Sequence, residues 1–73
     1  MNNWIDDTVI IDFPVPKDVK NLMDMCEVAN ANGDWGYFNY EESLDYICKE
    51  AVVQGHMTDR EWNEIRKRYE SYD

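Results

Sequence analysis

The sequence predicts a small, mainly α-helical domain with three short helices and an extended N-terminal segment. Three observations lead to this prediction. Apolar residues recur at three- and four-residue steps in three stretches, turn-forming residues separate those stretches, and two prolines follow a run of β-branched residues. We expect residues 1–73 to form one domain, because a chain of 73 residues supports only a single small core.

The N-terminal residues are predicted to be extended. The run 8–13 is rich in β-branched and aromatic residues, and Pro14 and Pro16 end it because each lacks an N–H donor. We expect a short strand or an arm laid across the helices, with residues 36–39 as a candidate second strand of a minimal two-stranded ribbon. The apolar side chains that would share one face of the run are Val9, Ile11 and Phe13.

The first helix is predicted at about 16–29. Pro16 suits the first turn of a helix, and Asp18 suits the positive end of the helix dipole. Residues 30–34 are rich in Asn and Gly, which favour turns and end the helix. The apolar face of this helix consists of Val19, Leu22, Met23, Cys26 and Ala29.

The second and third helices are predicted at about 40–54 and 59–72. Asn39 with Glu42 resembles a capping box for the second helix, and Gly55 is suited to end it. Thr58 with Glu61 gives the third helix the clearest start signal in the chain. Met57 and Trp62 add a hydrophobic staple around this start.

The charge of the chain is strongly negative and unevenly spread. The net charge is −9, from 16 acidic and 7 basic residues, and residues 60–73 are neutral. A polyanion of this kind disfavours direct binding to DNA or RNA phosphates and to anionic lipid surfaces. It remains compatible with binding to a basic protein.

The composition also narrows the class of protein. No stretch reaches the roughly 20 apolar residues of a membrane span, and the first residues lack the pattern of a signal peptide. We therefore expect a soluble, cytoplasmic protein with two reduced, buried cysteines, Cys26 and Cys48. The single His56 and the two serines have no recognisable catalytic partners, so we predict no enzymatic activity, no cofactor and no metal centre.

One segment resembles the calcium-binding loop of EF-hand proteins. Residues 30–42 place Asn30, Asn32 and Asp34 at alternating ligand positions, and Glu42 at the position of the final Glu. The resemblance requires Trp35 to be an inserted residue, and it implies a degenerate EF-hand-like calcium-binding module. The alternative interpretation is a capped turn between two helices.

The most informative feature for function is an acidic, aromatic stretch. Between residues 21 and 48 there are six carboxylates and five aromatic residues, but no Lys or Arg. Mutual repulsion in such a stretch favours a cationic partner, and aromatic residues are typical anchors of protein interfaces. We predict a partner-binding surface made of Asp34, Trp35, Tyr37, Glu41, Glu42 and Asp45.

By size and charge the chain resembles the compact inhibitors that phages and mobile elements use against host defence nucleases. The resemblance implies a nucleic-acid mimic, in which carboxylates occupy the basic groove of a nuclease or another nucleic-acid-binding protein. A third hypothesis is a structural or assembly protein that self-associates, for example as a homodimer, through residues 8–13.

Overall fold

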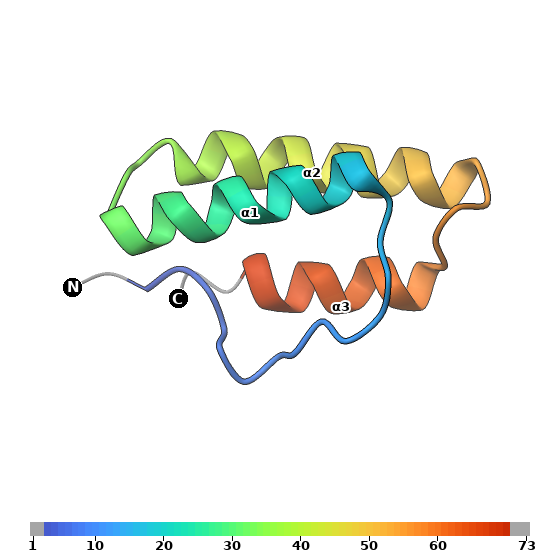
Figure 1. Ribbon diagram of the computed structural model, residues 1–73, viewed down its shortest axis with the longest axis horizontal. Helices are drawn as coiled ribbons and strands as arrows, with labels where there is room; N and C mark the ends of the chain where they lie inside the picture. The colour runs from blue at the N-terminus through green and yellow to red at the C-terminus, as the bar shows by residue number, and fades with distance from the viewer. Residues whose placement is uncertain (1–2, 71–73) are drawn as a thin grey trace.

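The protein consists of three α-helices preceded by an extended segment (Figure 1). The computed structural model describes residues 3–70. Helix α1 spans Lys17–Asn32, α2 spans Tyr37–Val53 and α3 spans Asp59–Tyr69. Helices α1 and α2 form an antiparallel hairpin, and α3 packs mainly against α2. The predicted mainly helical class with three helices is confirmed.

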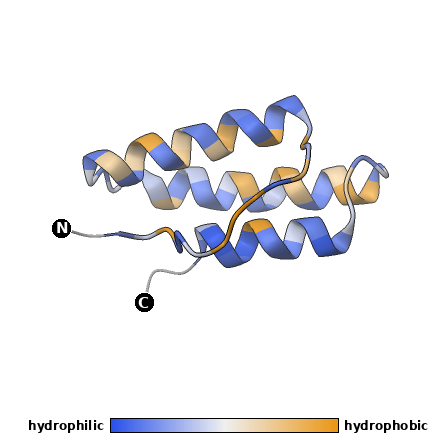
Figure 2. Cartoon of the chain, turned by 60° about the horizontal axis from the view of Figure 1, so that its bottom comes forward, coloured by the Kyte–Doolittle hydropathy of each residue, from blue (hydrophilic) through white to orange (hydrophobic). Residues whose placement is uncertain are grey.

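The predicted N-terminal strand and two-stranded ribbon are wrong, because residues 3–70 contain no β-strand. A strand needs a neighbour to complete its backbone hydrogen bonds, and residues 36–39 do not supply one. Gly36 is the N-cap of α2, and the next three residues already belong to this helix. Residues 9–13 are therefore extended but unpaired with another strand, and they cross the helices as an arm (Figure 2).

The turn between α1 and α2 is shorter than predicted. Helix α1 continues beyond residue 29 to Asn32, where Gly33 with φ 64° ends it and the N–H of Asp34 donates to the carbonyl of Ala29 at 2.9 Å. Helix α2 begins at Tyr37 instead of residue 40, with Gly36 as its N-cap and no side-chain capping bond. The carboxylate of Asp34 accepts a hydrogen bond from the N–H of Gly36 at 2.8 Å and so holds the turn before the helix. The predicted cap by Asn39 is wrong, because Asn39 already lies inside α2.

The start of α3 agrees with the prediction. The Thr58 hydroxyl accepts from the N–H of Glu61 at 3.1 Å, and the Glu61 carboxylate accepts from the N–H of Thr58 at 3.0 Å. Met57 is buried and Trp62 is half-buried, as a hydrophobic staple requires. The helix ends at Tyr69, and residues 71 and 72 of the predicted span lie outside the described residues.

The core lies between the three helices and the N-terminal segment. Trp4 and Ile5 are buried, so the segment contributes to the core as well as covering it. The apolar face predicted for α1 points inward. No described helix has the length and apolar character needed to cross a membrane. The buried apolar residues are Trp4, Ile5, Val19, Met23, Cys26, Ala29, Tyr37, Leu44, Cys48, Ala51, Met57, Ile65 and Tyr69.

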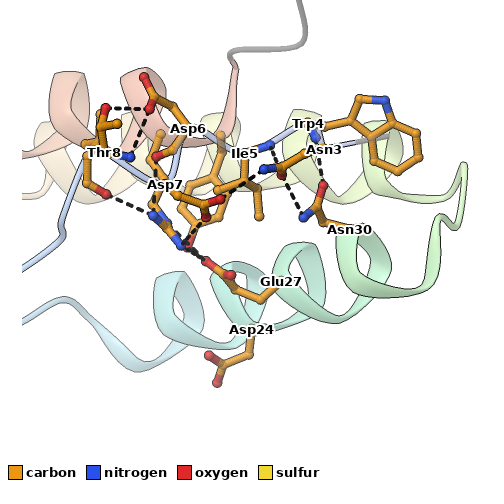
Figure 3. A network of polar contacts seen from close by, with 12 residues as sticks. Asn3, Trp4, Ile5, Asp6, Asp7, Thr8, Asp24, Glu27 and Asn30 are labelled. Atoms are coloured by element: carbon orange, nitrogen blue, oxygen red, sulfur yellow. Dashed lines mark hydrogen bonds and ion pairs between the residues drawn. The ribbon is translucent and has the colours of Figure 1, made fainter. Parts of the chain in front are cut away.

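Polar contacts made by Arg68 fasten the segment to the helices (Figure 3). Its guanidinium donates to the carbonyls of Val9 at 2.9 Å and Asp6 at 3.3 Å, and to the carboxylate of Glu27 at 3.0 and 3.1 Å. The same Glu27 oxygen accepts from the hydroxyl of Tyr69 at 2.7 Å. The network therefore joins α1, α3 and the N-terminal segment at one point.

A second polar contact holds the beginning of the segment. The Asn30 side-chain oxygen accepts from the N–H of Trp4 at 2.7 Å, and the Asn30 side-chain nitrogen donates to Asn3 at 3.0 Å (Figure 3). These bonds place the ring of Trp4 next to the α1–α2 turn, where it contacts Trp35, Tyr37 and Phe38.

Candidate partner-binding surface

The structure divides the six predicted site residues into exposed and buried ones. Asp34, Trp35 and Glu42 are exposed, and Asp45 is half-buried. Tyr37 and Glu41 are buried, with 0% and 8% of their surface accessible. The residues come from the α1–α2 turn and the first turns of α2, so they are close along the chain but face different directions.

Tyr37 belongs to the core, where none of its surface is accessible to a partner in this structure. Its ring stacks on that of Trp4 with centroids 5.3 Å apart, and its hydroxyl donates to the carbonyl of Tyr69 at the end of α3. This burial follows from the early start of α2, because successive residues of a helix point about 100° apart. Tyr37 and Glu41, four residues apart, consequently share the inward face.

Trp35 lies at the surface of the α1–α2 turn. Its side chain is 70% exposed, and its ring contacts those of Trp4 at 5.4 Å and Phe38 at 5.7 Å. These contacts hold a large amphipathic side chain in one position while leaving most of it accessible. A side chain that is ordered before binding loses less conformational entropy when a partner binds.

The acidic stretch is partly neutralised within the molecule. Arg68 pairs with Glu27 at 3.0 Å, and Arg66 lies 3.6 Å from Asp45, which also accepts from the indole N–H of Trp62 at 2.9 Å. Helix α3 thus supplies counter-cations that the stretch itself lacks. Asp45 is therefore engaged inside the molecule, although it was predicted to face a partner.

Asp34 and Glu42 differ from the other predicted acids. Neither forms an ion pair with any residue of the range 3–70. Asp34 uses one carboxylate oxygen to accept the N–H of Gly36 in the α1–α2 turn, and both side chains are exposed. Four of the seven basic residues already form ion pairs, so little positive charge is left to compensate these two acids.

A line of residues follows the outer side of α2, where Phe38 is half-buried and Glu42 and Tyr46 are exposed. These three positions are four residues apart, which brings them onto one face of the helix, and Trp35 in the preceding turn contacts the ring of Phe38 at 5.7 Å. Tyr46 is 62% exposed and extends the line beyond the predicted site. Its helical spacing from Phe38 and Glu42 is the signal in the sequence that identifies it. We call this surface the α2 ridge: Asp34, Trp35, Phe38, Glu42 and Tyr46.

An apolar groove borders the turn on the other side of α2. Met25 and Val28 of α1, which are 42% and 60% exposed, line it together with Tyr40 and Asp34. The segment and α3 leave this part of the hairpin uncovered. Asp34 therefore lies between the groove and the ridge.

The residues that resemble an EF-hand loop do not form such a loop. Asn30 and Asn32 belong to α1, and Glu42 lies well inside α2, so only residues 33–36 are outside the helices. The side-chain oxygen of Asn30 is used by the N–H of Trp4. In the described part of the chain, no group of three or more His, Cys, Asp or Glu side chains is arranged to hold a metal ion.

The two thiols lie in the core. Burial raises the pKa of Cys26 and of Cys48 to about 12, and the nearby carboxylates of Glu41 and Asp45 respectively raise it further. A thiol with so high a pKa is a poor nucleophile at neutral pH.

No protein-family model matches this chain, and comparisons with curated proteins and with solved structures found no similar one.

Proposed function

We propose that this chain is a small acidic protein that binds a cationic surface of another protein through the α2 ridge. The observation that carries the proposal is the combination of exposed Trp35, in the turn before α2, with exposed Tyr46 and Glu42 of α2, and Glu42 has no ion pair within residues 3–70. Trp and Tyr are the residues most enriched among binding hot spots. Unpaired carboxylates beside them select Arg or Lys on the partner.

The charge of the ridge is graded along its length. Asp34 and Glu42 lie toward the α1–α2 turn, whereas Lys49 follows Tyr46 by three residues on the same side of α2. The cationic part of the partner is therefore expected over the turn end of the ridge. Partner residues that contact the region near Lys49 are expected to be neutral or acidic.

More specifically, the chain is proposed to inhibit a nuclease or another nucleic-acid-binding protein. Such proteins carry Lys- and Arg-lined grooves, and a molecule with a net charge of −9 is attracted to them over several ångströms before contact. Asp34 and Glu42 would take the positions of phosphates, while Trp35 would pack against apolar or planar groups. This is the type of inhibition used by phages and mobile elements against defence nucleases.

The experiment is affinity capture from a lysate of the source cell, with three forms of the tagged protein compared side by side. The first form is wild type and the second carries Asp34→Asn with Glu42→Gln. The third carries Asp18→Asn with Asp59→Asn, which removes the same charge at the opposite end of the molecule, where α1 and α3 begin (Figure 1).

We expect wild type and the third form to capture the same nucleic-acid-binding protein, released at moderate salt, and the second form to lose it. An equal loss of capture in both variants would show that overall charge, and not the ridge, attracts the partner, and equal capture by all three forms would show that neither acid of the ridge is needed. Capture of a partner without a basic groove would contradict the inhibitor form of the proposal.

A further inference from the structure

The extended segment has the geometry of a strand without a sheet. Ile11 and Phe13 pack against the core and Val9 is half-buried, whereas Ile10 is 68% exposed and Asp12 is exposed. This alternation is that of a half-buried strand. Both ends are fixed, because Arg68 binds the carbonyl of Val9 and prolines follow residue 13 before α1 begins.

The backbone of this segment has no hydrogen-bond partner among the described residues from Ile10 to Phe13. Open grooves flank the segment on both edges. Met23 and Glu27 of α1 line one groove, and Arg60, Glu61 and Glu64 of α3 line the other. The helices therefore leave room beside the segment, and its N–H and C=O groups are free to pair with an added strand.

We propose that residues 9–13 bind an extended segment of another protein by β-strand addition. Backbone pairing of this kind gives affinity, while alternate side chains of the incoming strand give specificity. Residues 9–13 are already held in place by the helices, so this segment loses little conformational entropy when a strand is added. The surface is separate from the α2 ridge, so this inference does not depend on the proposed function.

The chemistry of the outward face identifies the incoming strand. An apolar side chain fits opposite Ile10, and a Lys or Arg fits opposite Asp12, which forms no ion pair within the described residues. A second copy of this chain fits poorly. In an antiparallel pair centred on Ile11, each Ile10 would face Asp12 of the other copy, and two molecules of charge −9 would be brought together.

The test uses the ¹⁵N-labelled full chain and a synthetic peptide in which a valine and a lysine are two residues apart, so that both side chains lie on the same face of the added strand. Chemical shifts and hydrogen exchange of individual backbone amides are measured by NMR during a titration. The control peptide has the same sequence but carries N-methyl groups on alternate residues, which removes the N–H donors of one edge and blocks pairing there. Asp12→Asn and Asp18→Asn are compared as matched charge variants.

We expect the unmodified peptide to shift the amides of residues 10–13 and to slow exchange of those on the paired edge by about tenfold or more at saturation. The methylated peptide is expected to leave them unchanged. Asp12→Asn should weaken binding several-fold, and Asp18→Asn should not. The inference is overturned if both peptides act alike, if the peptide shifts only residues of the α2 ridge, or if the same amides become protected by concentrating the protein alone.

Discussion

The contacts of Arg68 make a quantitative prediction about what holds this fold together. Its side chain is only 16% exposed and donates to two carbonyls of the N-terminal segment and to Glu27 of α1. In Arg68→Met the apolar stem is kept and every one of these bonds is lost. Hydrogen bonds that involve a charged group contribute about 1.5–3 kcal/mol each, but those that water can replace contribute less.

The loss of stability in Arg68→Met depends on which of the groups bonded to Arg68 can be hydrated by water instead. The Glu27 side chain is 41% exposed and becomes hydrated, so its bonds add little to the loss. The two carbonyls and the released segment account for most of it, and we expect unfolding to become easier by about 2–3 kcal/mol. A domain of this length has a total stability of about 4–10 kcal/mol, and the melting temperature should fall by about 10–20 °C.

The assay is thermal unfolding followed by circular dichroism, with Arg66→Met as the matched control. Arg66 is in the same helix, and its substitution changes the net charge equally. It is 48% exposed, it forms ion pairs with Asp45 and Glu70, and its guanidinium lies 5.5 Å from the centroid of the Trp62 ring. Its loss should cost less than about 1 kcal/mol. Equal melting temperatures for the two variants would refute the view that Arg68 fastens the segment.

Three further predictions concern the core and the segment. Tyr37→Phe removes the hydroxyl bonded to the carbonyl of Tyr69, and chemical denaturation should show a loss of about 1–2 kcal/mol, whereas an unchanged midpoint would contradict that bond. Asn30→Ala should speed hydrogen exchange at the N–H of Trp4 by about tenfold with a smaller change in global stability, and unaltered exchange would argue against the bond between them. Because the pKa of Cys26 and of Cys48 is raised in the folded state, the folded protein keeps these thiol protons to a higher pH than the unfolded chain does. The free energy of unfolding should therefore fall as the pH rises from about 9 toward about 12. Both thiols should also resist Ellman's reagent at pH 8 until the protein is denatured.

Local signals were sufficient to predict the helices. The apolar stripe of α1 and the capping box of Thr58 with Glu61 depend on residues three or four positions apart, and the sequence shows such patterns directly. The start of α2 was misplaced because the pattern of Asn39 with Glu42 resembles a capping box, although Asn39 already lies inside the helix. The helix begins at Tyr37, three residues earlier than predicted, and this start places Tyr37 in the core against Trp4.

Contacts between distant residues could not be predicted from local patterns. Arg68 reaches Val9 across 59 positions of the chain, and Asn30 reaches Trp4 across 26. For the same reason the acidic stretch suggested that Asp45 lacked a counter-cation, although Arg66 lies beside it. The exposed part of the site, Trp35 with its acidic neighbours, could be anticipated because adjacent helical residues cannot all face inward.

The central claim is that a cationic partner is recognised electrostatically through the α2 ridge. Its most direct test is the association rate constant of wild type with the captured partner, measured by surface plasmon resonance from about 50 to about 500 mM NaCl. We predict a steep fall of this rate with salt for wild type and for Asp18→Asn with Asp59→Asn, and a shallower fall for Asp34→Asn with Glu42→Gln. A rate that is insensitive to salt, or identical slopes for all three forms, would contradict the claim.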